Sequence, residues 1–212
     1  MSRGCFLAVE GPDGAGKSTL VRALADHFVA AGLDPVLVRE PGGTPVAERI
    51  RAMLLDPAHG IEPVSELFLF LAARADLVAR VIRPALEAGR PVLADRFQLS
   101  TEAYQCGGRG LPRELFQTAN LAATGGLSPD LTLVLDLPPE LGFARIRTTG
   151  GTLDRIEQAG AAFHARVAEV FRNATGASLL HLDATQSSEQ VLQAAWTAAR
   201  ALLTGAPRTD QH

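Results

Sequence analysis

The sequence has 212 residues, of which 47% are hydrophobic and 20% charged, a balance typical of one globular domain that needs no disulfide or metal to build a core. Its net charge of −3 argues against a broad basic surface for nucleic acid, and no run reaches the roughly 18 apolar residues of a membrane span. The N-terminus lacks the apolar core of a signal peptide, and two cysteines are too few for a disulfide framework. We therefore expect a cytoplasmic protein that binds neither nucleic acid nor membranes.

Five short apolar segments predict the strands of a parallel sheet. They are continuously apolar rather than alternating, which is typical of strands buried on both faces. In chain order they cover residues 5–10, 35–39, 91–95, 131–137 and 178–183. Between them, helical periodicity predicts helices over 17–31, 66–83 and 112–124, and a last helix that opens with a capping box of Ser187 and Gln190.

Strands that alternate with helices indicate an α/β fold with helices on both faces of the sheet and right-handed crossovers. We expect one domain over residues 1–204. The polar tail from 205 to 212 has no periodicity, so we expect it to be frayed.

The first predicted strand leads into a phosphate-binding loop. Residues 11–18 read Gly-Pro-Asp-Gly-Ala-Gly-Lys-Ser and match G-x-x-x-x-G-K-[ST] between a strand and a helix, as the motif requires. Several backbone N–H groups of such a loop point at one anion, and the start of the helix adds a favourable partial charge. Lys17 can reach the β- and γ-phosphates of a nucleotide, and the Ser18 hydroxyl can bind Mg²⁺. The residues expected to contact ATP here are Gly11, Pro12, Asp13, Gly14, Ala15, Gly16, Lys17, Ser18 and Thr19.

The loop alone does not define a reaction, because GTPases, motor ATPases and small-molecule kinases share it. The sequence has no Asn-Lys-x-Asp motif for guanine and no apolar run that ends in Asp-Glu, as hydrolytic ATPases often have. Its short length favours a small kinase.

Further motifs follow at the ends of the predicted strands, where open α/β sheets bind ligands. They read Arg-Glu-Pro-Gly-Gly-Thr at 39–44, Phe-Leu-Ala-Ala-Arg at 70–74, Asp-Arg-Phe at 95–97, Ser-Thr-Glu-Ala-Tyr-Gln at 100–105 and Leu-Asp-Arg-Ile-Glu at 153–157. In this order behind a phosphate loop, they resemble the bacterial thymidylate kinases, from residue 10 to about residue 186. The resemblance implies a P-loop kinase fold with a five-stranded parallel sheet of strand order 2-3-1-4-5, a short mobile lid and a homodimer. It also implies transfer of the ATP γ-phosphoryl group to dTMP, with Mg²⁺ as cofactor.

The resemblance assigns the acceptor phosphate and the metal to charged residues at the strand ends. Arg96 should hold the phosphate of dTMP, because a guanidinium binds phosphate through two parallel hydrogen bonds. Asp95 should assist Ser18 with Mg²⁺ and its waters. Arg39 and Glu40 should position the phosphate and metal-bound water, and Asp13 should contact the 3′-hydroxyl.

The resemblance assigns the base and the sugar to a second group of residues. Phe70 should stack on thymine, and Arg74 and Thr101 should hydrogen-bond its edge. Tyr104 should form the wall beside the sugar, and Gln105 belongs to the same substrate site. Without the family pattern, Phe70 would read as a core residue, since most aromatic side chains pack inside.

A lid over approximately residues 145–157 should supply positive charge. The phosphate loop has no arginine between Gly11 and Gly16, so the lid arginines are the remaining candidates. Arg145 is assigned to ATP, and which lid arginine acts at the transition state stays open. The catalytic residues expected are Lys17, Asp95, Arg96, Arg147 and Arg155.

Two glycine-rich segments, residues 107–110 and 150–151, are predicted to be mobile loops over the site.

Two alternatives to a thymidylate kinase stay open. One is a kinase for another nucleotide or a deoxynucleoside, and the other is a non-catalytic protein gated by a nucleotide.

Overall fold

The computed structural model describes residues 3–148 and 154–204. Five parallel strands form one sheet in the order β2-β3-β1-β4-β5. The strands are β1 (Phe6–Glu10), β2 (Val36–Arg39), β3 (Val92–Asp95), β4 (Leu131–Asp136) and β5 (Leu179–Asp183). The predicted fold class, strand positions and strand order are confirmed, with boundaries that differ by one residue at most.

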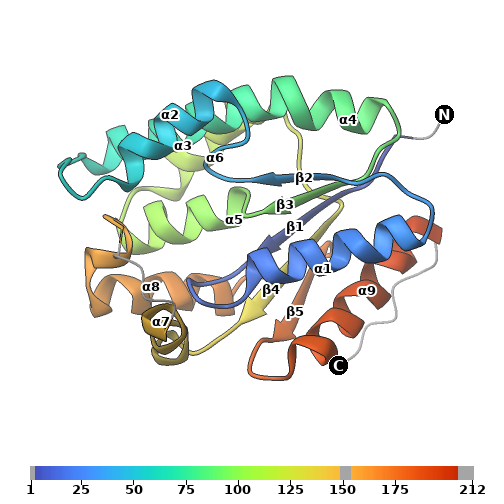
Figure 1. The fold of residues 1–212 in the computed structure, drawn as a ribbon. Coiled ribbons are helices and arrows are strands. Elements are labelled where there is room, and N and C mark those ends of the chain that lie inside the picture. The colour runs from blue at the N-terminus through green and yellow to red at the C-terminus, as the bar shows by residue number, and fades with distance from the viewer. Residues whose placement is uncertain (1–2, 149–153, 205–212) are drawn as a thin grey trace.

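Helices cover both faces of the sheet and its carboxyl end (Figure 1). The α-helices are α1 (Lys17–Ala30), α2 (Pro45–Leu55), α3 (Pro63–Leu77), α4 (Arg83–Glu87), α5 (Gln98–Thr101), α6 (Arg113–Thr124), α7 (Pro139–Thr148), α8 (Ala161–Arg172) and α9 (Ser188–Thr204). Two π-helical segments, η1 (Val78–Ile82) and η2 (Glu102–Gly108), continue α3 and α5, and a short 3₁₀ turn, η3 (Glu157–Ala159), precedes α8. None of the helices described is long and apolar enough to cross a membrane.

The central strand β1 shows how the sheet builds two cores. Leu7 and Val9 pack with α1 and α9 on one face, whereas Phe6 and Ala8 pack with η1 and α4 on the other. Successive side chains of a strand point to opposite faces, so a strand covered on both sides must be apolar throughout. All five residues of β1 are buried, including the terminal Glu10.

The helix predicted over residues 66–83 is longer in the structure. It begins at Pro63, the first residue of α3, and runs through η1 to the end of α4. Proline suits the first turn of a helix because its missing N–H has no partner there. The predicted capping box is confirmed: the Ser187 Oγ accepts from the N–H of Gln190, and the Ser187 N–H donates to Gln190 Oε1, both over 3.2 Å.

The prediction of a mobile loop at residues 107–110 is wrong for its first half. Gly107 and Gly108 belong to the π-helical segment η2, and Gly108 is buried. A side chain at these glycines would collide with Val170 and Phe163 of α8. Close packing of η2 on α8, rather than mobility, explains the glycines. The second glycine pair, at 150–151, and the central part of the predicted lid lie outside the described residues.

Candidate active site

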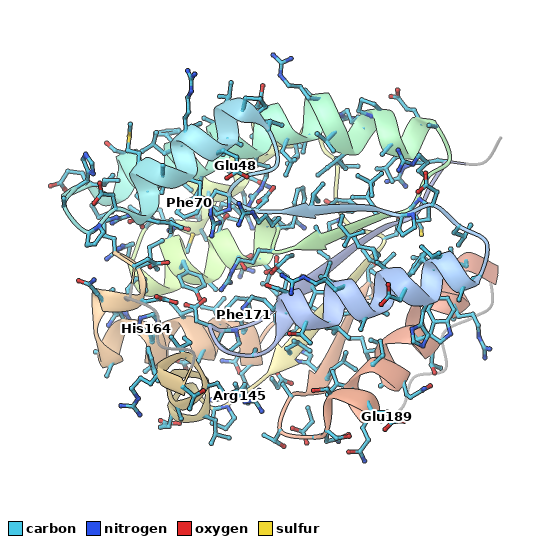
Figure 2. The ribbon with its side chains drawn as sticks, viewed as in Figure 1. Glu48, Phe70, Arg145, His164, Phe171 and Glu189 are labelled. Carbon is cyan, nitrogen blue, oxygen red and sulfur yellow. The ribbon has the colours of Figure 1, made fainter. Side chains whose placement is uncertain are left out.

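A cavity of about 540 Å³ lies at the carboxyl ends of the strands. Its wall is built by the phosphate loop, the loop after β2, α3, η2 and α7. Figure 2 shows Phe70 of α3 and Arg145 of α7 on either side of this end of the sheet. The volume is that of a typical small-molecule site. Most of the predicted site residues line this one cavity: Asp13, Gly14, Gly16, Lys17, Ser18, Thr19, Arg39, Glu40, Phe70, Arg74, Asp95, Arg96, Thr101, Tyr104, Gln105 and Arg145.

The phosphate loop joins β1 to α1 in the geometry that the motif requires. Gly14 and Gly16 have φ angles of 75° and 92°, in the left-handed region that favours glycine. Gly16 is also the N-cap of α1, so the free N–H groups of the first turn are available to an anion. Lys17, the first residue of α1, folds back and donates from Nζ to the carbonyl of Pro12 over 2.6 Å.

The ammonium group of Lys17 is easier to deprotonate than that of an ordinary lysine. Burial and the nearby Arg96 lower its pKa to about 8, although Asp13, Asp95 and Glu10 act in the opposite direction. A phosphate group that enters the loop would bring negative charge to Lys17 and favour its charged form.

Ser18 and Asp95 form the candidate metal position. The Ser18 hydroxyl donates to the carboxylate of Asp95, and both residues line the cavity. Oxygen ligands of this kind suit Mg²⁺, which usually keeps several waters and binds through one or two protein oxygens together with phosphates. Residues 3–148 and 154–204 contain no cluster of three His, Cys, Asp or Glu side chains that could enclose a metal, so the pair would act with a nucleotide rather than as a closed metal centre.

Arg96 has a strained backbone directly after β3. Its φ of 73° is positive, which is costly for a residue other than glycine and is often found at functional sites. The guanidinium donates to the carbonyl of Gly11 over 3.2 Å and to Ser100 Oγ over 2.9 Å. The strained backbone turns the Arg96 side chain toward the phosphate loop.

Asp13, Arg96 and Tyr104 form a polar triangle between the loop and η2. The guanidinium of Arg96 donates to Asp13, and the Tyr104 hydroxyl donates to the other Asp13 oxygen over 2.6 Å. Burial alone would raise the pKa of Asp13, but Arg96 and Lys17 hold it below its usual range. Burial and the charge of Asp13 raise the pKa of Tyr104 well above 10, so its phenol stays a donor.

Arg74 is the largest of the fully buried side chains that the structure describes, with 1% of its surface exposed. It donates from Nε and Nη2 to Glu40 at distances from 2.5 to 3.1 Å. Its Nη1 donates to Asn120 over 2.7 Å, and its Nη2 donates to Thr101 over 2.7 Å. Because Arg74 and Glu40 are both buried, loss of either would leave an uncompensated charge, which typically costs about 3–5 kcal/mol. The structure thus pairs Glu40 with Arg74, the arginine that was predicted to bind the base.

Gln105 and Arg155 meet at a third buried carboxylate, that of Glu66. Gln105 donates to Glu66 over 2.9 Å, and Arg155 Nη2 lies 2.6 Å from it in an ion pair that is not a well-aligned hydrogen bond. Arg155 also donates from Nε to the carbonyl of Leu54 over 2.7 Å. The structure therefore places Arg155 against the ends of α2 and α3, and not among the residues that line the cavity.

Two arginines of the predicted lid lie on α7. Arg145 donates to the carbonyls of Gly14 and Ala184 over 3.4 and 3.0 Å, beside the phosphate loop. Arg147 is exposed near the end of the same helix.

One arginine of the cavity, Arg51, was not anticipated from the sequence. Its Nη1 donates to the carbonyl of Pro41 over 2.9 Å, and Arg39, which donates to Glu48, lines the same wall. A signal did exist. The helical spacing that buries Ala47 and Leu54 of α2 also turns Arg51 inward.

Comparison with known proteins agrees with this geometry. A family model described as thymidylate kinase matches residues 9–195. A thymidylate kinase of Deinococcus radiodurans is 46% identical over 201 residues, which cover 93% of this chain and 97% of that protein. A thymidylate kinase of Pseudomonas putida is 50% identical over 192 residues, with 89% and 91% of the two chains covered. A thymidylate kinase of Desulfovibrio desulfuricans is 51% identical over 174 residues, with 79% and 80% covered. The chain therefore belongs to the thymidylate kinase family.

Proposed function

We propose that this chain transfers the γ-phosphoryl group of ATP to the 5′-phosphate of dTMP, which gives dTDP and ADP for the synthesis of dTTP. The observation that carries the proposal is a single cavity that joins two kinds of wall. Lys17 and Ser18 line it at the phosphate loop and the start of α1, and Arg74 and Thr101 line it from α3 and α5, which we assign to the acceptor. Membership of the thymidylate kinase family supports the same substrate pair.

Positioning and charge neutralisation account for the reaction. The acceptor phosphate is already a competent nucleophile, so no general base is needed. Arg96 would hold this phosphate in line with the γ-phosphoryl group, while Lys17 and Arg145 neutralise the donor phosphates. Arg147, which like Arg145 is exposed on α7, is the cation that we assign to the transferring group. The same role stays a prediction for Arg155, whose guanidinium is engaged with Glu66 in this structure.

Mg²⁺ belongs to the proposal as the cofactor that arrives with ATP. Ser18 and Asp95 would hold it, and it would neutralise charge on the β- and γ-phosphates. Arg39 and Glu40 stay assigned to the acceptor phosphate and metal-bound water, with Glu40 acting in addition on Arg74. Asp13 is the proposed contact of the 3′-hydroxyl.

The acceptor wall fits a pyrimidine with a carbonyl at position 4. Arg74 can only donate hydrogen bonds, so it can pair with the oxygen of a keto group but not with an amino group, which is itself a donor. Phe70 supplies the stacking face, and Thr101 and Gln105 complete the edge. Tyr104 would close the space that a ribose 2′-hydroxyl needs.

We also propose a single kinase domain, a cytoplasmic location in which the free thiols of Cys5 and Cys106 stay reduced, and a homodimer.

Large apolar side chains are exposed on the neighbouring helices α2, α3 and α6, at the top of Figure 1. They are Val46, Met53, Val64, Phe68 and Leu121, each with at least 44% of its surface exposed. A second copy of the chain is the proposed partner of this face, and Phe68→Glu should give a monomer in sedimentation.

A coupled assay of ADP release tests the proposed activity. dTMP, dUMP, dCMP, dGMP and a reaction without acceptor are compared at equal concentration. We expect dTMP to give the highest kcat/KM and the reaction without acceptor to be negligible. If dCMP or dGMP is the best substrate, the chain is a kinase for another nucleotide, and if no acceptor stimulates ADP release, it is not a kinase for monophosphates.

A further inference from the structure

Glu66, in the first turn of α3, is a buried carboxylate that the proposed reaction does not use. Its side chain is inaccessible to solvent, yet two hydrogen-bond donors and one further cation converge on it. Gln105 donates from Nε2 over 2.9 Å, Arg109 donates from Nε and Nη2 over 3.0 Å each, and Arg155 Nη2 lies at 2.6 Å. A buried carboxylate is stable only when it is paired in this way.

The charge of Glu66 determines how the Gln105 amide is oriented. Burial alone would raise the pKa of Glu66, but the hydrogen bonds from Arg109 and Gln105 hold it below its usual range. An ionised carboxylate only accepts hydrogen bonds, so Gln105 must present its NH₂ group to Glu66. Gln105 also lines the cavity, and its amide oxygen is the group left to accept a hydrogen bond from elsewhere.

The helical spacing extends this effect to the base-binding wall. Glu66, Phe70 and Arg74 are four residues apart and therefore lie along one stripe of α3. Thr101 and Gln105 are likewise four residues apart, at the end of α5 and within η2. Arg74 bonds to Thr101 and Glu66 bonds to Gln105, so two polar cross-links hold the two segments together on either side of Phe70.

We propose that Glu66 is a positioning residue for the acceptor base. It fixes α3 against η2 and turns the Gln105 amide so that Arg74 offers donors and Gln105 offers an acceptor to the base edge. This pair of fixed polarities suits a pyrimidine with a keto group at position 4 and an N–H at position 3. The same two polarities disfavour binding of a pyrimidine that has an amino group at position 4 and an unprotonated nitrogen at position 3. The inference rests on the proposed function and adds the source of its base selectivity.

Replacement of Glu66 by glutamine tests the inference at almost constant shape. The amide can present either oxygen or NH₂ to Gln105, so the orientation of Gln105 is no longer fixed, and Arg109 and Arg155 lose the anion between them. We expect the ratio of kcat/KM for dTMP to that for dCMP to fall by about tenfold, mostly through a higher KM for dTMP, the effect expected for one charge-assisted hydrogen bond. The Kd of a non-hydrolysable ATP analogue should stay within about twofold, since the donor site is untouched. Glu62→Gln, an exposed change at the start of the same helix, should alter none of these values.

A second variant keeps the test decisive if Glu66→Gln does not fold. Arg109→Met removes one donor to Glu66 and keeps an apolar chain over the ring of Phe163, which the Arg109 guanidinium covers at 4.7 Å. It should lower the dTMP to dCMP ratio in the same direction and by less. A purely structural role of Glu66 would lower the melting temperature and leave this ratio unchanged. An unchanged ratio in every folded variant, in a wild type that prefers dTMP, overturns the inference alone. A wild type that does not phosphorylate dTMP overturns the proposed function and the inference with it.

Discussion

The donor side and the acceptor side of the cavity hold their charged groups in different ways. On the donor side, Lys17 and Arg145 donate to backbone carbonyls, neutral partners that phosphate oxygens can replace. On the acceptor side, Arg74 is paired with the buried carboxylate of Glu40, and Glu66 is surrounded by donors. In the proposed reaction, the donor groups follow a phosphoryl group that moves, whereas the acceptor groups are in place before the base arrives. Preorganised polar groups of the second kind give selectivity at little cost during the reaction.

The largest effect is expected from Lys17→Ala. It should lower kcat by about 10²-fold or more, because a preorganised cation next to the transferring group is lost. Steady-state kinetics at saturating ATP and dTMP measure the effect. Arg22→Ala, which removes an exposed cation from the same helix, should leave kcat unchanged, and a Lys17→Ala enzyme of nearly normal rate would refute the role of the phosphate loop.

Arg74→Lys should lower kcat/KM for dTMP by about 10- to 100-fold, since an ammonium cannot reproduce the planar fork that binds Glu40, Asn120 and Thr101 together. The Kd of an ATP analogue should change little. Calorimetric titration of the two ligands separates the effects. Arg80→Lys, a mostly exposed change on the same helical segment, serves as the control. Loss of ATP affinity with normal dTMP affinity would show that Arg74 serves the donor side.

Tyr104→Ala should lower the preference for dTMP over its ribose analogue by roughly tenfold, because rejection of an added hydroxyl is steric and modest in size. Tyr104→Phe keeps the ring and should retain most of this preference, although it loses the hydrogen bond to Asp13. The measured quantity is the ratio of kcat/KM for the two substrates. An equal loss in both variants would assign the preference to the hydroxyl of Tyr104 rather than to its ring.

The last expected effect is a pH dependence of ATP binding, which needs no substitution. The pKa of Lys17 is about 8 in the free protein, and phosphate favours the protonated form. Below pH 8 the ammonium is already charged and affinity should be constant, whereas above pH 8 it should fall by up to about tenfold per pH unit. Lys17 is the only lysine in the sequence, so carbon-13-labelled lysine gives one side-chain NMR signal that reports its titration directly. A pKa near 10.5 and a flat affinity up to pH 9 would contradict the expectation.

The sheet was predictable from the sequence because each strand is apolar throughout, and the phosphate loop was predictable because its glycines and Lys17 are fixed in spacing. The polar contacts that join segments far apart in the chain, such as those of Glu66, were not predictable. Nothing local distinguishes Glu66 from an exposed glutamate in the first turn of a helix, and its burial becomes visible only when η2 packs beside α3. The role of Arg155 at the phosphates stays a prediction, and its ion pair with Glu66, 89 residues earlier in the chain, was not visible in the sequence.

The central claim is that the acceptor side selects the base independently of the donor side. The ratio of kcat/KM for dTMP to that for dCMP in the Lys17→Ala enzyme tests it most directly. Both rate constants should fall by about 10²-fold, and their ratio should remain that of the wild type, because the acceptor wall is held by Arg74, Glu40 and Glu66 without help from Lys17. A ratio that collapses toward one would contradict the account and place base selection on the donor side.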